Sequence, residues 1–297
     1  MPSTKNRKKD KSKKDGSKKG ASKQKTGRKK DRKLSAKTAD RLELYQRSVN
    51  SPDTDVDFLI NTFQDLRGRS IQHLREDFCG TAALAAEFLR RDPIHTAEGV
   101  DLDPEPVAWG KRRNFEPTAG LLDRMTFHLA DVRSPSDKRP DVTCAQNFSY
   151  WCFKTRKEML GYFRSIHSDL KEDGMLVLDL YGGPEAITEM EEERDIDGAF
   201  TYVWDQREYL PGSGTYHSAI HFRFKDGSEM ENAFEYEWRF WHLTEIRDVL
   251  VDAGFKSVRP YFEGTDPDDE EEGNGIFAHD EEGENCEAWI GYLVALK

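Results

Sequence analysis

Cysteine is scarce in this sequence and follows no pattern. Among 297 residues there are four cysteines, Cys79, Cys144, Cys152 and Cys286, and no two form a Cys-x-x-Cys pair. A disulfide framework and a cysteine-ligated zinc site are therefore not expected, and no metal site is predicted. Unpaired cysteines suit a reducing compartment, so we expect a cytoplasmic protein, or a nuclear one if the source is eukaryotic.

Long apolar runs are missing as well. No stretch approaches the 18 or so consecutive apolar residues that a membrane-spanning helix needs. The N-terminus also lacks the apolar segment of a secretory signal. We therefore expect neither a membrane span nor export.

Basic and acidic residues are separated along the chain. Residues 1–34 hold 16 Lys or Arg and 3 Asp, whereas the rest holds 29 Lys or Arg and 53 Asp or Glu. A lysine-rich segment with almost no apolar residues cannot form a core, so residues 1–36 are predicted to be a disordered tail. Residues 1–34 suit a weak contact with a polyanion, although a solubilising extension is the simpler interpretation. The segment from Glu263 to Glu287 has 12 acidic residues and no Lys or Arg, and is interpreted as a solvated acidic loop.

From about residue 70, short apolar segments alternate with helical patterns. This alternation is typical of βαβ units and predicts an α/β fold with a doubly wound parallel sheet. Two short helices are expected in residues 37–69 and are interpreted as a lid. Three aromatic-rich segments separated by the turn sequences PGSG and KDGS predict an antiparallel β meander, inserted at about 198–241. The main domain is thus predicted to span residues 70–297, with the meander as a substrate cap.

The turn from the first predicted strand into its helix, Glu76-Asp-Phe-Cys-Gly-Thr-Ala82, has a single glycine. A dinucleotide-binding turn carries G-x-G-x-x-G, so a pyrophosphate cradle is not indicated. The acidic Glu76 suits an ammonium group and would repel a phosphate, which favours a cofactor with an amino-acid end over NAD or ATP. Asp101 closes the second predicted strand, where a carboxylate accepts hydrogen bonds from ribose hydroxyls, and Asp131 closes the third, where an adenine amino group would fit.

These motifs, in this order, resemble the class I S-adenosylmethionine-dependent methyltransferases. The segment from Glu76 to Ala82 is similar to that family's first motif, acidic-x-G-x-G-x-G, but has Phe78 and Ala82 at two glycine positions. The resemblance implies a seven-stranded Rossmann-like sheet and S-adenosyl-L-methionine (SAM) as cofactor. It also implies a set of cofactor-binding residues: Glu76, Phe78, Cys79, Gly80, Thr81, Asp101, Leu102, Asp131, Val132 and Asn147.

The predicted reaction is in-line transfer of the methyl group to an N, O or S nucleophile of a small-molecule acceptor. Aromatic and polar residues after the fourth and fifth strands and in the meander are the candidates for the acceptor side. Tyr150, Tyr181 and Arg239 are catalytic candidates, and Tyr45, Trp151, Trp204, Gln206 and Trp241 are substrate candidates. Two alternatives remain open: a methyltransferase acting on RNA or protein and targeted by the basic tail, and a SAM-binding module without catalysis.

Overall fold

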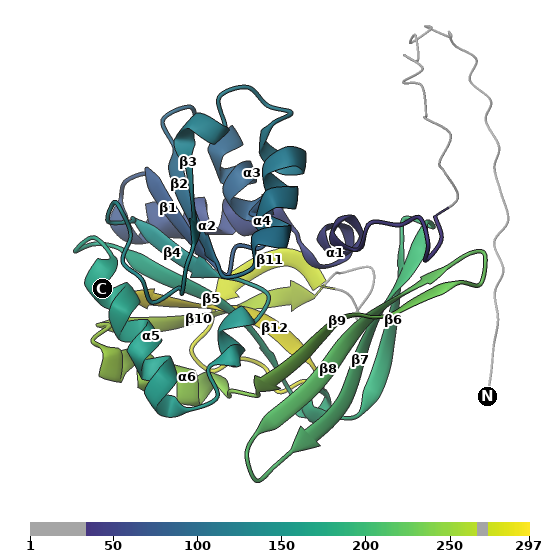
Figure 1. Cartoon of the computed structure of the whole chain (residues 1–297). Helices are drawn as coiled ribbons and strands as arrows, with labels where there is room; N and C mark the ends of the chain where they lie inside the picture. The colour runs from purple at the N-terminus through teal and green to yellow at the C-terminus, as the bar shows by residue number, and fades with distance from the viewer. Residues whose placement is uncertain (1–33, 266–272) are drawn as a thin grey trace, which may run out of the picture. The chain divides into compact units, whose positions relative to one another are not determined.

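The computed structural model describes residues 34–265 and 273–297, and its largest element is an eight-stranded sheet (Figure 1). The strand order is β11-β10-β12-β5-β4-β1-β2-β3. The strands β1 to β5 pair in parallel, whereas β10, β11 and β12 run antiparallel to their neighbours. Their bounds are β1 His73–Asp77, β2 Thr96–Asp101, β3 Met125–Leu129, β4 Val142–Ala145, β5 Met175–Gly182, β10 Ser257–Thr265, β11 Gly273–His279 and β12 Trp289–Leu296.

Helices cover both faces of this sheet. The apolar sides of α2 (Pro52–Arg67), α3 (Ala83–Arg91) and α4 (Pro104–Gly110) share one core cluster, and those of α5 (Arg156–Asp169) and α6 (Leu243–Ala253) share another. The central strand β5 contributes alternate residues to both clusters, so it is buried on both faces. This explains why its sequence is a continuous apolar run.

The main sheet has eight strands, where seven were expected. The extra strand β11 lies within the segment that was interpreted as a solvated acidic loop, and residues 266–272 of that segment lie outside the described residues. The ring of Phe277 packs against Phe58 and Tyr292, which anchors the strand despite its acidic flanks. The acidic composition of the segment as a whole concealed this local apolar contact.

A second sheet follows β5 in the chain and has four antiparallel strands. They are β6 Met190–Ile196, β7 Phe200–Leu210, β8 Thr215–Phe224 and β9 Glu229–Arg239, in the order β6-β7-β8-β9. The sequence indicated only the last three. The strand β6 has the sequence MEEERDI and is exposed at every position except Ile196, so it shows neither apolar alternation nor a turn signal.

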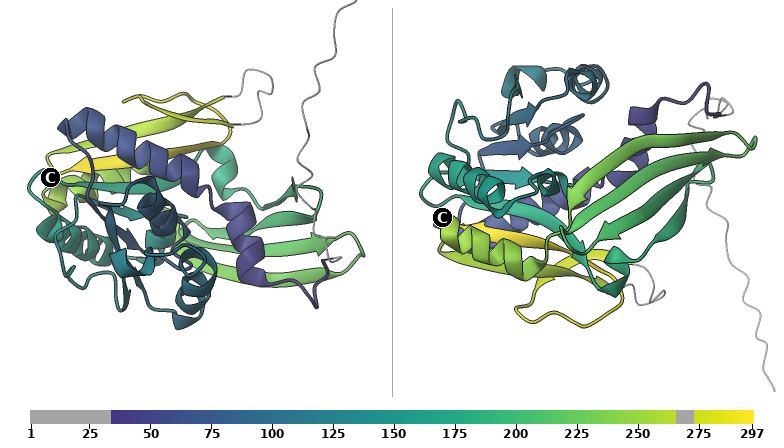
Figure 2. Two further views of the ribbon diagram at one scale, coloured as in Figure 1. Left: turned by 90° about the horizontal axis from the view of Figure 1, so that it is seen from above. Right: turned by 60° about the horizontal axis from the view of Figure 1, so that its bottom comes forward.

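The two N-terminal helices have different partners. The helix α2 packs in the core of the main sheet through Val56, Leu59 and Phe63, so it is not part of a lid. By contrast α1 (Arg41–Val49) packs against the second sheet, together with residues 34–36 of the segment predicted as tail. The left view of Figure 2 shows α2 along the main sheet and the dark purple α1 beside the green strands of the second sheet. Residues 1–33 of the predicted tail lie outside the described residues.

Two helical glycines give a matched test of this packing. A Cβ at Gly110 of α4 would lie 2.1 Å from the Thr81 carbonyl oxygen, whereas a Cβ at Gly161 of α5 would meet nothing within 4 Å. We expect Gly110→Ala to lower the free energy of unfolding by about 1–3 kcal/mol through overpacking. We expect Gly161→Ala to raise it by about 0.5–1 kcal/mol through helix propensity. Urea unfolding of both variants would measure the two changes, and equal effects would contradict the close α4–loop contact.

Candidate functional site

The loop between β1 and α3 adopts an unusual backbone. Phe78, Gly80 and Ala82 all have positive φ angles, of 54°, 49° and 51°. A left-handed conformation costs a residue with a Cβ roughly 1–2 kcal/mol. The loop therefore takes the shape that three alternating glycines would take freely, with two non-glycine residues under strain.

Two hydrogen bonds to the end of β2 fix this loop. The Cys79 amide donates to the Val100 carbonyl at 3.1 Å, and the Gly80 amide donates to Asp101 Oδ2 at 2.7 Å. A Cβ at Gly80 would meet no atom within 4 Å, so open space lies beside this residue. The loop thus presents its backbone to a cavity, a geometry suited to the close approach of a ligand.

Glu76 is the buried acid at the end of β1. Its Oε2 accepts a hydrogen bond from the Ala85 amide at 2.9 Å, in the first turn of α3. Burial raises the pKa of Glu76 to about 8, because little water remains to solvate the charged form, and the Ala85 bond offsets only part of this effect. A cationic ligand group next to Glu76 would supply the missing counter-charge.

Two further strand ends add polar groups near the loop. Asp101 at the end of β2 accepts from Gly80 and also from the Asp103 amide, while Asp103 caps α4 by accepting from the Glu105 amide at 2.9 Å. Leu102, which follows Asp101 in the chain, is 72% exposed, which is unusual for a leucine beside a buried loop. Asp131 after β3 pairs with Arg133 at 2.5 Å.

The turn after β4 is also strained. Asn147 and Phe148 have φ angles of 57° and 56°, and their amides donate to the two carboxylate oxygens of Asp179 on β5, at 2.6 and 3.0 Å. Burial raises the pKa of Asp179 to about 7, against the lowering effect of these two bonds. Asp179 therefore holds the turn that carries Gln146, Asn147 and Ser149.

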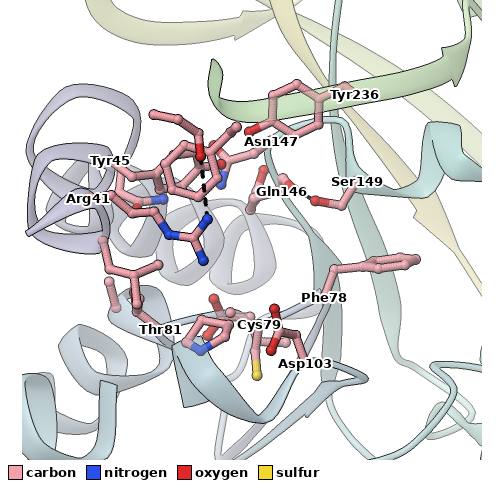
Figure 3. Close-up of a pocket in the computed structure, with 18 of the residues that line it drawn as sticks. Arg41, Tyr45, Phe78, Cys79, Thr81, Asp103, Gln146, Asn147, Ser149 and Tyr236 are labelled. Carbon is pink, nitrogen blue, oxygen red and sulfur yellow. Dashed lines mark hydrogen bonds between the residues drawn. The ribbon is translucent and has the colours of Figure 1, made fainter. Parts of the chain in front are cut away.

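These pieces enclose a cavity of about 430 Å³ (Figure 3). Its floor is the β1–α3 loop with Asp103, and one wall is the turn after β4. The opposite side is formed by α1, through Arg41 and Tyr45, and by residues 232–236 of β9. A volume of this size is in the range of small-molecule and cofactor sites.

Polar contacts tie α1 to the loop and to α4. Gln46 Oε1 accepts from the Thr81 hydroxyl and from the Asn114 side chain, both at 2.9 Å, and Asn114 also donates to the Thr81 carbonyl. Asn114 lies in a π-helical turn, Lys111–Phe115, that extends α4. Trp109 Nε1 donates to Asp40 Oδ2 at 2.7 Å at the start of α1. The helix is thereby held over the cavity.

The structure divides the predicted site residues into three groups. Seven line the cavity: Tyr45, Glu76, Phe78, Cys79, Gly80, Thr81 and Asn147. Four lie at the ends of β2 and β3 without lining it: Asp101, Leu102, Asp131 and Val132. Seven are not among the lining residues and pack elsewhere: Tyr150, Tyr181, Trp151, Trp204, Gln206, Arg239 and Trp241.

The contacts of this last group explain their placement. Arg239 pairs with Glu245 at 2.9 Å and lies over the ring of Trp241, so its guanidinium is not free for a substrate carboxylate. Trp241 Nε1 donates to the Phe153 carbonyl, and the Tyr150 hydroxyl donates to the Asp179 carbonyl.

The remaining members of the group are likewise held by structural contacts. Gln206 bridges β7 to the carbonyls of Glu185 and Thr188. Trp204 and Trp151 pack in the aromatic core between the two sheets, with Tyr181.

The sequence alone did not indicate most of the cavity-lining residues that come from α1 and from the second sheet. The missed lining residues are Arg41, Leu42, Asn50, Asp77, Ala83, Asp103, Pro106, Gln146, Ser149, Asn232, Ala233, Phe234, Glu235 and Tyr236. Asp103 had a local signal, since an Asp before Pro-Glu is a helix N-cap pattern. The residues of β9 had none, because their approach to the loop is tertiary.

No protein-family model matches the sequence, and no curated protein matches it either. Solved structures do match in fold. A SAM-dependent methyltransferase from Clostridium acetobutylicum ATCC 824 aligns with a TM-score of 0.62 and 17% identity, over 86% of this chain and 96% of that one. The fold is that of a class I SAM-dependent methyltransferase.

Two further solved methyltransferases align over similar lengths. CalS10 from Micromonospora echinaspora, an amino pentose methyltransferase solved with SAM bound, has a TM-score of 0.61 and 17% identity, over 86% of this chain and 94% of its own. The sugar N-methyltransferase KedS8 from Streptoalloteichus sp. ATCC 53650 has a TM-score of 0.58 and 16% identity, over 89% and 94%. At such identities the likeness establishes the fold.

Neither a metal-binding cluster nor a membrane-spanning helix is found among the described residues. In residues 34–265 and 273–297, no cluster of three or more His, Cys, Asp or Glu side chains is placed to hold a metal ion. Over the same ranges, no helix is both long and apolar enough to cross a membrane.

The raised pKa of Glu76 predicts a pH-dependent stability of the ligand-free protein. The folded state keeps its proton up to about pH 8, whereas the unfolded chain releases it near its ordinary value of 4.5. The free energy of unfolding should therefore fall as pH rises between these values, by a few kcal/mol in total. In Glu76→Gln this loss should be smaller by the Glu76 share, since other buried acids with a raised pKa, such as Asp179, still contribute, while the exposed control Glu116→Gln should behave as wild type. Parallel pH dependence of all three proteins in urea unfolding would rule out a buried, neutral Glu76.

Proposed function

We propose that the protein binds SAM and transfers its methyl group to a small-molecule acceptor. The observation that carries the proposal is the cavity between the left-handed β1–α3 loop and the wall formed by α1 and β9. It places an open backbone and a buried acid on one side and aromatic side chains on the other. A methyl donor and a methyl acceptor need two such sides facing each other.

The cofactor side supplies groups that complement each part of SAM. Glu76 would carry the charge opposite the methionine ammonium, and the open space at Gly80 admits the ribose and sulfur region. Asp101 would accept from the ribose hydroxyls. The exposed Leu102 and the side chain of Val132 would lie on either side of the adenine, with Asp131 at its amino group.

Methyl transfer from SAM requires little of the protein beyond aligning the acceptor with the methyl group. The sulfonium methyl is electrophilic as bound, so the site has to hold the acceptor in line with the carbon–sulfur bond and exclude water. The α1 helix would act as the lid, because Arg41 and Tyr45 cover the cavity from above the loop. The two aligned sugar methyltransferases named above support a small polar acceptor.

The composition of the N-terminus favours one second candidate, a methyltransferase acting on RNA or protein. The 16 Lys or Arg of residues 1–34 would supply a weak polyanion contact, whereas the acidic remainder of the chain disfavours a polyanion at the cavity itself. Binding of RNA lost on removal of residues 1–33, together with methylation of that RNA, would favour this candidate.

The first test is calorimetric titration with SAM and with S-adenosylhomocysteine. We expect micromolar binding of both and no binding of NADH. Asp101→Asn should weaken SAM binding by at least about tenfold, because it removes charge-assisted hydrogen bonds to the ribose and loosens the Gly80 amide. The exposed Asp123→Asn is the matched control and should bind as wild type. If neither sulfur ligand binds, the methyltransferase proposal fails.

The pH dependence of SAM binding tests Glu76 separately. A cationic ligand prefers the ionised carboxylate, so the wild-type affinity should rise from pH 7 to pH 8 by about fivefold, given a pKa of about 8. The ammonium group of the ligand titrates in the same way in measurements on wild type and on Glu76→Gln. The ratio of the two association constants therefore reports on the Glu76 carboxyl alone. A constant ratio across pH would show that Glu76 does not face the ammonium.

A further inference from the structure

The acceptor side of the cavity has a chemical bias that the proposed function does not specify. We propose, resting on that function, that the methyl acceptor is a neutral amine whose N–H groups are bound by the hydroxyls of Tyr45 and Tyr236. Three features of the cavity lining support this acceptor: acids that already have partners, neutral phenols and aromatic faces.

The acids that line the cavity are already engaged. Asp77 accepts from Arg75 at 2.7 Å and from the Tyr162 hydroxyl at 3.0 Å, and Glu235 pairs with Arg207 at 3.2 Å. Glu76 and Asp103 bond backbone amides at the starts of α3 and α4, on the cofactor side of the cavity.

The other ionisable lining groups provide no base either. Arg41 pairs with Glu105 at 2.7 Å, and the lining residues include no His or Lys. Burial raises the pKa of the Cys79 thiol well above its usual range. A hydroxyl acceptor must lose its proton as it attacks, and these lining residues offer no free base to take it.

The two tyrosines are suited to orient an amine and not to deprotonate an alcohol. Burial raises the pKa of Tyr45 to about 12 and that of Tyr236 well above its usual range. Both phenols are therefore neutral near pH 7. A neutral phenol oxygen accepts a hydrogen bond from an amine N–H and leaves the nitrogen lone pair free. An alcohol bound in the same way would keep its proton and remain a weak nucleophile.

Aromatic faces surround this pair. The Tyr45 ring lies 4.8 Å from that of Phe234, and the Tyr236 ring stacks on Trp238 at 4.3 Å. Figure 3 shows Tyr45 and Tyr236 on the side of the cavity opposite Cys79 and Asp103. Such faces favour the positive charge that an amine develops as it is methylated.

The reaction balances without a protein base. The amine lone pair forms a bond to the methyl carbon as the carbon–sulfur bond breaks. The electron pair of the broken carbon–sulfur bond stays on sulfur and gives the thioether. The nitrogen product carries one positive charge and loses a proton to water. The acceptor must therefore enter as the free amine, so turnover should follow the fraction of acceptor that is neutral.

Methylation of matched probes at saturating SAM tests this inference. The probes are 2-phenylethylamine, 2-phenylethanol and 3-phenylpropionate, and mass spectrometry detects S-adenosylhomocysteine and the methylated product. We expect methylation of the amine alone, with a rate that rises about tenfold per pH unit below the amine's pKa. Tyr236→Phe should lower kcat/KM for the amine by about tenfold and leave the Kd of SAM unchanged. Tyr209→Phe on β7 removes a hydroxyl outside the cavity and should change neither.

The outcomes separate this inference from the proposed function. SAM binding with methylation of the alcohol or the carboxylate at a comparable rate would overturn the amine, as would methylation of none of the three probes. A rate that does not rise with pH would also overturn it, because no free amine would then be required. Failure of SAM to bind would instead overturn the methyltransferase proposal.

Discussion

The candidate site depends on one backbone constraint, the alternation of left-handed residues at 78, 80 and 82. This alternation turns the chain from β1 into α3 within a few residues and directs the Gly80 amide at Asp101 and the Ala85 amide at Glu76. It also brings the Thr81 carbonyl against Gly110, where no side chain fits. The position of α4, its π-helical turn and the helix α1 that bonds to it all follow from this turn.

Two of the three left-handed positions are strained, and the packing around them offsets the cost. The Phe78 ring makes edge contacts with Phe153 and Tyr162, so it joins the loop to α5. Tyr162 also donates to Asp77 from the same side. The methyl group of Ala82 is fully buried in the core beneath α3. Burial of an aromatic ring contributes more than the roughly 1–2 kcal/mol that a left-handed residue costs. A glycine at either position would have the required backbone but would lose these contacts.

The parts of the fold that were predictable from sequence are those whose signal is local. The run MLVLDLY predicts a strand buried on both faces and is β5, and the segment from Glu76 to Thr81 lines the cavity as one continuous stretch, from the end of β1 into the loop. The strands β6 and β11 were missed because charged residues dominate their segments and a few contacts decide their place. Trp204 and Trp241 lie in the aromatic core and not in the cavity lining, since aromatic enrichment marks the core between two sheets as readily as a ligand site.

The acceptor side of the cavity could not be predicted from the sequence, because tertiary packing assembles it. Tyr45 lies on α1 and Tyr236 on β9, nearly two hundred residues later in the chain. The two meet because α1 packs on the second sheet through Leu44 and Tyr45. On its other side α1 meets the loop and α4 through polar pairs such as Gln46–Thr81 and Asp40–Trp109. Water can replace a polar pair at little net cost, whereas separating apolar surfaces costs about 25 cal/mol per Å². The α1–α4 contact is thus the weaker of the two, so α1 and β9 form the more durable unit.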